Sequence, residues 1–123
     1  MIYLLEDDDS IRDLVMYTLS TQSMEVRGFD RPSEFWEAMT ELPSLILLDI
    51  IMPIVNGFDF LEWIQNRPKY QHIPIVFTSI AATNENILKG LRMGVRDVLF
   101  KPYDWGRVER CVENLLALVE YLL

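Results

Sequence analysis

The stretch Leu45-Ile46-Leu47-Leu48-Asp49 decides the fold of this chain, because an unbroken apolar run ends there on a carboxylate. A strand without polar residues at alternate positions is buried on both of its faces, which is typical of a parallel sheet. We therefore predict a central strand at 45–48, with Asp49 at its carboxyl end.

Short apolar runs alternate with longer amphipathic stretches on both sides of this strand. Four further strands are predicted at Ile2–Leu5, Met24–Phe29, Ile75–Phe77 and Val98–Phe100. Five helices are predicted at Ser10–Leu19, Pro32–Met39, Phe58–Asn66, Asn84–Met93 and from Asp104 to about Leu122. This alternation predicts an α/β fold, with a parallel sheet covered by helices on both faces.

Local signals mark the ends of these helices. Ser10 or Asp9 would cap the first one, since a short oxygen-bearing side chain accepts the free N–H groups of a first turn. Pro32 suits a first helical turn, Gly94 suits the left-handed position after a helix, and Asp104 would cap the last helix.

The composition predicts one domain, residues 1–123, in a chain of ordinary globular balance. The net charge of −8 makes direct contact with nucleic acid a poor expectation and favours cations or a basic partner. No apolar run is long enough to span a bilayer, and the first residues lack the basic start of a signal peptide. We therefore expect a cytoplasmic protein, with the single cysteine, Cys111, as a small buried apolar residue.

Polar side chains follow four of the five predicted strands. Glu6 and Asp7 follow the first strand, Asp49 the third, Ser79 the fourth and Lys101 the fifth. In an open parallel sheet, ligands bind outside the carboxyl ends of the strands. The sequence therefore predicts that these five side chains meet at one edge of the sheet.

The chemistry of that edge indicates phosphoryl transfer. Carboxylates of Glu6, Asp7 and Asp49 held close together repel one another unless a cation compensates, and Mg²⁺ prefers such oxygen ligands. Lys101 would add positive charge and Ser79 a hydroxyl donor, the groups that position and neutralise a phosphoryl group. Asp49 would be the nucleophile and an aspartyl phosphate the product.

Simpler explanations exist for each motif taken alone. The acids Asp8 and Asp9 suit the positive end of a helix dipole without any ligand. Asp49 could cap a loop, and Lys101 before a proline could occupy a surface turn. The coincidence of these residues on one edge favours the site.

The chain resembles the receiver domain of two-component response regulators from end to end. The motifs that carry the resemblance are Leu5-Glu6-Asp7, Asp49-Ile50-Ile51-Met52-Pro53 with Gly57, Ser79, and Lys101-Pro102. Ser79 rather than Thr78 matches the family's hydroxyl position, by its spacing from Lys101. The resemblance implies a doubly wound, flavodoxin-like sheet with strand order 2-1-3-4-5.

The resemblance also implies the metal ligands. Asp7, Asp49 and the backbone carbonyl of Ile51 would bind Mg²⁺ directly, and Glu6 would do so directly or through water. Mn²⁺ would be an acceptable substitute.

The remaining roles follow from the same resemblance. Lys101 would pair with the phosphoryl oxygens, Ser79 would hydrogen-bond the phosphoryl group, and the Lys101–Pro102 bond would be cis. The donor would be a phosphohistidine on a sensor kinase or phosphotransfer protein. The domain would act as a regulatory switch, with self-catalysed phosphoryl transfer and slow autodephosphorylation as its only chemistry.

Three positions depart from the family pattern. Ile80 follows Ser79 where a small side chain is usual, and Ile51 is apolar at the mouth of the site. Val98 stands three residues before Lys101, where the family often has an aromatic switch residue. We expect slow loss of the phosphoryl group and a readout without the usual aromatic relay.

The last helix carries a wide apolar stripe. Its members are Trp105, Val108, Cys111, Val112, Leu115, Leu116, Leu118, Val119 and Leu122. Core packing explains most of it; the rest, with the helix at 84–93 and the strand at 98–100, would form a homodimer surface. The apolar end at Leu122 suggests a domain excised from a longer regulator, and a stand-alone receiver is the alternative.

Two other classes of protein share features with this sequence. A pseudo-receiver would keep the fold without phosphorylation, and Ile80 and Val98 leave that hypothesis open. A Mg²⁺-dependent phosphatase usually has a second acid two residues after its nucleophile, and Ile51 occupies that position here.

Overall fold

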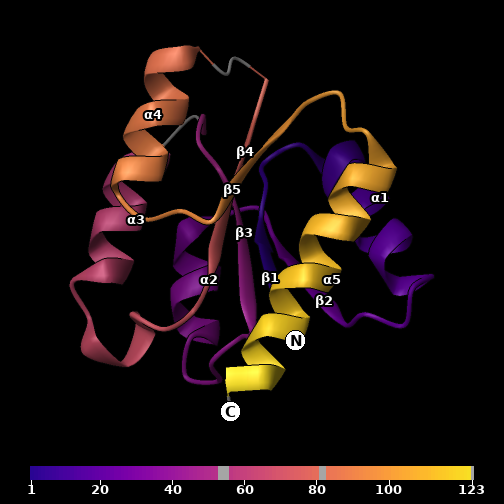
Figure 1. The fold of residues 1–123 in the computed structure, drawn as a ribbon, viewed down its shortest axis with the longest axis horizontal. Coiled ribbons are helices and arrows are strands. Elements are labelled where there is room, and N and C mark those ends of the chain that lie inside the picture. Colours follow the sequence, from indigo (N-terminus) through magenta and orange to yellow (C-terminus); the bar gives the residue numbers. More distant parts are fainter. Residues whose placement is uncertain (53–55, 81–82, 123) are drawn as a thin grey trace.

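The computed structural model describes residues 1–52, 56–80 and 83–122, with side chains up to residue 118. It contains a parallel sheet in the order β2-β1-β3-β4-β5 (Figure 1). The strands are β1 (Ile2–Leu5), β2 (Val26–Phe29), β3 (Leu45–Asp49), β4 (Ile75–Ser79) and β5 (Asp97–Phe100). The α/β fold and the predicted strand order are thereby confirmed.

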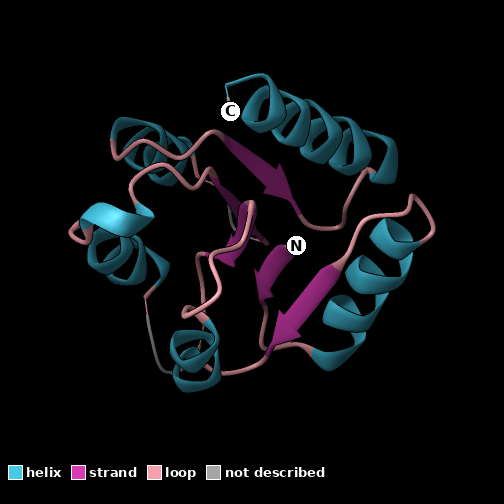
Figure 2. Cartoon of the chain, turned by 90° about the horizontal axis from the view of Figure 1, so that it is seen from below, coloured by secondary structure: helices cyan, strands magenta, loops and turns pink. Residues whose placement is uncertain are grey.

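Helices cover both faces of this sheet (Figures 1 and 2). They are α1 (Asp9–Ser20), α2 (Pro32–Ala38), α3 (Gly57–Gln65), α4 (Asn84–Arg92) and α5 (Trp105–Leu122), with a short 3-10 helix, η1 (Pro68–Tyr70). Helices α1 and α5 pack on one face, and α2, α3 and α4 pack on the other. No helix in the described part of the chain is both long enough and apolar enough to cross a membrane.

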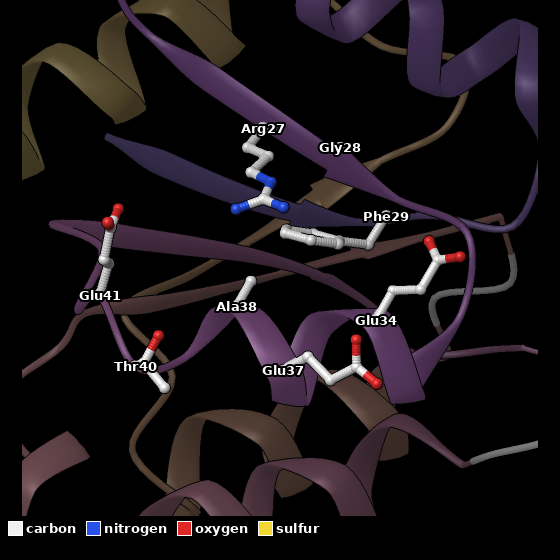
Figure 3. A pocket seen from close by; sticks show the side chains of 8 residues that line it. All are labelled: Arg27, Gly28, Phe29, Glu34, Glu37, Ala38, Thr40 and Glu41. Atoms are coloured by element: carbon white, nitrogen blue, oxygen red, sulfur yellow. The ribbon is translucent and has the colours of Figure 1, made fainter.

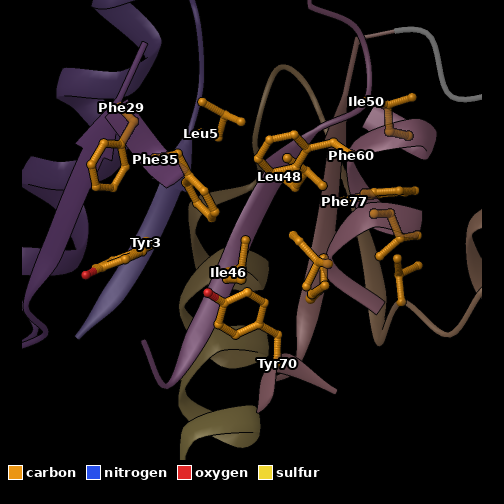
Figure 4. Packing of buried hydrophobic residues seen from close by; sticks show 14 of the residues in the cluster. Tyr3, Leu5, Phe29, Phe35, Ile46, Leu48, Ile50, Phe60, Tyr70 and Phe77 are labelled. Carbon is orange, nitrogen blue, oxygen red and sulfur yellow. The ribbon is translucent and has the colours of Figure 1, made fainter. Parts of the chain in front are cut away.

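The two faces bury separate apolar clusters, because side chains alternate along each strand. Leu45 and Leu47 of β3 face α1 and α5, together with Val76 of β4. Ile46 and Leu48 face the aromatic cluster beneath α2 and α3 (Figure 4). By the same alternation, the side chain of Asp49, at the carboxyl end of β3, lies on the face of the sheet that α1 and α5 cover.

Strand register brings the ends of the strands into line. Leu5 of β1 pairs with Leu48 of β3, so Glu6 lies beside Asp49. Asp49 is in turn the register partner of Thr78 in β4. The ladder therefore delivers the residues after β1, β3 and β4 to one edge of the sheet.

The five predicted helices are confirmed, each with ends that differ by at most one residue, but the predicted cap of α1 is wrong. Asp8, rather than Ser10 or Asp9, caps this helix: its backbone is extended, and its carboxylate accepts the N–H of Ile11 at 3.0 Å. Asp9 and Ser10 already lie within the first turn, so neither can occupy the capping position. The correction moves the start of the helix one residue towards Glu6.

The other local signals hold. Pro32 begins α2, Gly94 has a φ of 99° after α4, and the N–H of Arg107 donates to Asp104 at 3.3 Å. The Lys101–Pro102 peptide bond is cis, as the resemblance implied.

Four of the five strands differ from their predicted bounds: β3 ends one residue later, at Asp49, β5 begins one residue earlier, at Asp97, and β2 and β4 differ by two residues each. β2 begins at Val26 rather than Met24, because it is an edge strand that pairs only with β1. β4 continues to Ser79 because its last carbonyls accept the N–H groups of Ile50 and Lys101. The polar end of β4 is thus held by the ladder and not by apolar burial.

Most of the apolar stripe on α5 is core. Val108, Cys111 and Val112 are buried, and burial raises the pKa of the Cys111 thiol to about 12. Leu118 is exposed. The side chains of Val119 and Leu122 lie outside the described residues, as does Pro53 of the Asp49 motif.

Gly57 is the glycine on which the shape of this edge depends. A Cβ atom there would lie 2.6 Å from Ile50 Cα and 2.7 Å from the carbonyl oxygen of Asp49. We expect Gly57→Ala to lower the free energy of unfolding by about 1–3 kcal/mol, since backbone atoms cannot move aside cheaply. Urea denaturation measures this change.

Gly106→Ala is the matched control in the first turn of α5. Its Cβ would meet only the ends of the Arg110 and Asp104 side chains, at 3.2 Å and 3.4 Å. Stability should stay the same or rise by up to about 1 kcal/mol, from better helix propensity. An equal loss of stability in both variants would contradict the steric explanation.

Candidate functional site

A pocket opens at the carboxyl edge of the sheet, beside the N-terminal end of α1. Its volume is about 360 Å³. The residues that line it are Glu6, Asp7, Asp8, Ile11, Asp49, Ile51, Ile80 and Lys101. The structure therefore brings together four of the five side chains predicted to meet at this edge: Glu6, Asp7, Asp49 and Lys101.

The ammonium group of Lys101 lies at the centre of this arrangement. Its Nζ donates to Glu6 Oε1 and to Asp49 Oδ2, the latter at 3.2 Å. The side chain of Lys101 is only 6% exposed, and both carboxylates are more than nine-tenths buried. Two strand ends with like charge are thus joined by one buried cation, in a surrounding where charge–charge interactions are strong.

The three acids also have the geometry of a cation site. Glu6, Asp7 and Asp49 each offer one carboxylate oxygen, and these oxygens lie within 4.8 Å of one another. Glu6 and Asp49 are buried while Asp7 is exposed, so the cluster is open to solvent on one side. An all-oxygen set with an open side fits Mg²⁺, which binds few carboxylates and keeps several waters.

Backbone contacts fix the two buried acids. Asp49 Oδ1 accepts the N–H of Ile51 at 3.1 Å, so one carboxylate oxygen is held by the loop and the other by Lys101. The guanidinium of Arg12 donates to the carbonyl of Glu6 at 2.9 Å. Arg12 was not among the predicted site residues. It stands one helical turn after the cap residue Asp8, and this spacing is the sequence signal that could have identified it as a neighbour of Glu6.

Burial and charge shift the pKa values of the central pair. Burial is the largest cause that raises the pKa of Glu6, to about 7, with the nearby Asp49 adding to it and Lys101 opposing it. Burial would lower the pKa of Lys101, but its hydrogen bond to Glu6 and the charge of Asp49 outweigh that effect and raise it. By formal charge, three carboxylates face one ammonium at this edge, so negative charge is in excess even with the lysine in place.

Ser79 lies at the end of β4 but does not line the pocket. The residue is fully buried, and its carbonyl accepts the N–H of Lys101 at 2.8 Å. Ile51 and Ile80 do line the pocket, with 55% and 74% of their surface exposed. They form an apolar rim around the acids.

A larger hollow, about 480 Å³, opens between β2 and α2 (Figure 3). Arg27 and Phe29 approach it from the strand, and Glu34, Glu37 and Glu41 come from α2 and the residues after it. Arg27 lies over the Phe29 ring, 5.1 Å from its centroid. No ion pair joins these side chains, all of which the structure describes, and none of them reaches the acid pocket.

The fold and the site together define a doubly wound α/β domain with acids and a lysine gathered at its carboxyl edge. The family model described as the response regulator receiver domain matches residues 2–113. The chain belongs to this family, whose members act in two-component signalling and interact with histidine kinases or phosphotransfer proteins.

Named relatives agree with this assignment. The chain is 32% identical over 121 residues to the transcriptional regulatory protein GltR of Pseudomonas aeruginosa, covering 98% of this chain and 50% of that protein. It is 30% identical over 114 residues to an uncharacterised 14.6 kDa protein of Leptolyngbya boryana, covering 92% and 87%. The chain spans about half the length of the first curated relatives it matches.

A solved structure confirms the fold. The receiver domain of NtrX from Brucella abortus superimposes with a TM-score of 0.87 at 27% identity, covering 95% of this chain and 98% of that one.

The raised pKa of Glu6 predicts a pH-dependent stability. Native Glu6 keeps its proton up to about pH 7, while the unfolded chain loses it near 4.5. The native state binds more protons between these values, so the free energy of unfolding falls as pH rises through them. Without divalent cations, Glu6→Gln should become more stable relative to the parent over this range, by on the order of 2 kcal/mol.

Urea denaturation of both proteins across this pH range, with chelator present, measures the difference. Parallel curves for the two proteins would show that Glu6 keeps its ordinary pKa.

Proposed function

We propose that this domain is a phosphorylation-dependent switch in which Asp49 accepts a phosphoryl group from a phosphohistidine. The observation that carries the proposal is the contact of one buried ammonium, that of Lys101, with both Glu6 and Asp49. A carboxylate at the mouth of a pocket, beside a fixed cation, can take on a negatively charged group that repulsion would otherwise exclude.

The reaction needs only positioning and neutralisation of charge. A carboxylate oxygen of Asp49 attacks the phosphorus, the new P–O bond forms as the P–N bond breaks, and the imidazole leaves with the electron pair. Lys101 pairs with an oxygen of the incoming phosphoryl group. Ser79 would supply a hydrogen bond once the group is attached.

Mg²⁺ is the cation we propose for the acid cluster, with Mn²⁺ as a substitute. Asp7, Asp49 and the carbonyl of Ile51 would hold it, with Glu6 acting directly or through water. When bound, the ion supplies charge neutralisation to the phosphoryl oxygens and to Glu6, whose pKa is raised mainly by burial and further by the nearby Asp49.

The donor would be a sensor histidine kinase or a phosphotransfer protein, and the exchange would take place in the cytoplasm. The domain itself would be regulatory, its chemistry limited to accepting and slowly losing the group. Direct contact with DNA would fall to a separate output domain, because a domain of net charge −8 repels phosphates. The half-length match to proteins named transcriptional regulators favours such a longer chain.

Beryllofluoride, a phosphoryl mimic, tests the assignment of Asp49. With Mg²⁺ present it should change the tryptophan fluorescence of the protein, saturably and only when both components are added. Asp49→Ala should abolish the response, because the mimic needs the carboxylate. Asp59→Ala, an acid in the first turn of α3 outside the pocket, is the matched control and should respond like the parent. A response that survives Asp49→Ala would contradict the proposal.

The apolar rim predicts a long-lived phosphoryl group. Ile51 and Ile80 are the exposed apolar side chains that line the pocket, and they hinder the approach of an attacking water. We expect a half-life of minutes or longer in the parent, shortened several-fold by Ile80→Ala, as measured by decay of radiolabel. A parent half-life of only seconds would contradict this expectation, and it would also reopen the phosphatase hypothesis that an apolar Ile51 disfavours.

Helix α4, strand β5 and helix α5 present an apolar surface that we propose as a homodimer interface. Leu88, Leu91, Phe100 and Leu118 are each between 42% and 50% exposed on these elements. Phosphorylation would tune the association. Sedimentation with Mg²⁺ and beryllofluoride should show a dimer that Leu88→Glu weakens; a monomer at high concentration, with and without the mimic, would count against it.

A further inference from the structure

Two buried hydroxyl groups near the pocket lack hydrogen-bond partners. They are the Oγ1 of Thr78 and the phenolic oxygen of Tyr103, and they are the only buried side-chain oxygen or nitrogen atoms in the described residues with this property. Thr78 is 1% exposed. A buried hydroxyl without a partner costs free energy, so a valine would be the more stable residue at this position.

Both hydroxyls belong to residues that lie close, in the sheet or in the sequence, to Asp49 and Lys101. Thr78 is the register partner of Asp49 on one side and of Leu99 on the other, so these side chains share one face of the sheet. Tyr103 follows Lys101 by two residues and packs against the same apolar cluster as Leu99. Its ring makes an edge contact with Trp105, the first residue of α5, at 5.2 Å between centroids.

The phenol of Tyr103 interacts with Thr78 and with the charged cluster. Burial is the main cause that raises the pKa of Tyr103, while interactions with Thr78 and with the charge of Lys101 lower it. The approach of the two hydroxyls falls outside the geometry of a formed hydrogen bond. The pair is therefore adjacent but unsatisfied, next to the Lys101 ammonium.

Lys101 has one N–H donor that makes no hydrogen bond within the described residues. An ammonium group carries three N–H donors, and within the described residues Lys101 uses two of them, towards Glu6 and Asp49. A phosphoryl group on Asp49 and a cation beside Glu6 both draw these acceptors into new bonds. Lys101 then pairs with a phosphoryl oxygen, and its third N–H can take a further acceptor, which a hydroxyl can turn to offer.

We propose that Thr78 and Tyr103 are positioning residues for phosphoryl transfer: their hydroxyls form a relay that accepts the third N–H of Lys101 while the lysine engages the phosphoryl group. Tyr103 accepts from Lys101 and donates to Thr78, which satisfies both orphaned groups together. The inference rests on the proposed function of Asp49 and deepens it. Through the contact of Tyr103 with Trp105, the relay also links the site to the start of α5. This link does not involve Val98, which stands where the family often has an aromatic switch residue.

A set of four variants separates this role from simple packing. Thr78→Val keeps the shape and removes the hydroxyl, Thr78→Ser keeps the hydroxyl and removes a methyl group, and Tyr103→Phe removes the phenolic oxygen. Thr78→Val with Tyr103→Phe is the double variant. The rate of Asp49 phosphorylation from acetyl phosphate with Mg²⁺, and the midpoint of thermal unfolding, are measured for each.

The relay predicts that the phosphorylation rate and the thermal stability rank Thr78→Val and Thr78→Ser in opposite orders. Phosphorylation should slow about tenfold in Thr78→Val and in Tyr103→Phe, no further in the double variant, and less than about twofold in Thr78→Ser. Thermal stability should be equal or higher in Thr78→Val and lower in Thr78→Ser, since only packing matters there. A purely structural role predicts that rate follows stability.

Tyr70→Phe is the matched control, because Tyr70 is a buried tyrosine on the opposite face, packed beneath α3. It should leave the phosphorylation rate unchanged. Parent rates in Thr78→Val and Tyr103→Phe, or equal slowing in Thr78→Val and Thr78→Ser, would overturn the relay while leaving Asp49 as the acceptor. A parent protein that takes up no more phosphoryl group than Asp49→Ala would overturn both.

Discussion

The buried ammonium of Lys101 is the interaction on which the carboxyl edge of this sheet depends. Glu6 and Asp49 end two adjacent strands, and register alone would hold their like charges side by side in a surrounding of low polarity. The lysine, delivered by β5 from the far side of β4, contacts both. Removing the lysine would leave two buried carboxylates without a compensating charge.

The positive charge of Lys101 does not balance the negative charge of this edge, and the remaining negative charge favours the binding of a cation. Residues 1–49 hold eleven of the nineteen acidic residues and only three of the eleven basic ones, so the net charge of −8 resides entirely in this part of the chain. All four carboxylates that line the acid pocket, those of Glu6, Asp7, Asp8 and Asp49, come from this part. A cation is attracted to this edge, and a phosphoryl group can be accepted only when cations offset the charge it brings.

Much of the fold and the site follows from the sequence, because the deciding signals are local. The apolar run before Asp49 and the polar residues after the other strands place Glu6, Asp7, Asp49 and Lys101 correctly, since parallel strands must align their ends. The cap of α1 was wrong by one residue, because Asp8, Asp9 and Ser10 are chemically equivalent as caps and only the backbone distinguishes them.

Other features depend on contacts that no local pattern records. Arg12 holds the Glu6 carbonyl across the β1–α1 loop, and Tyr103 packs against the apolar cluster that contains Leu99 only once β5 and α5 are in place. Thr78 is indistinguishable by sequence from an ordinary strand threonine. Its significance appears only with its burial beside Asp49, which is a property of the assembled sheet.

The identity of the residue that carries the phosphoryl group tests the role of Asp49. After phosphorylation with Mg²⁺ and acetyl phosphate, borohydride reduction converts an aspartyl phosphate to homoserine, and peptide mass spectrometry locates the converted residue. The account predicts conversion at Asp49 alone, dependent on the divalent cation and much reduced in Lys101→Met. Conversion at another acid of the cluster, or none at Asp49 with the cation present, would contradict it.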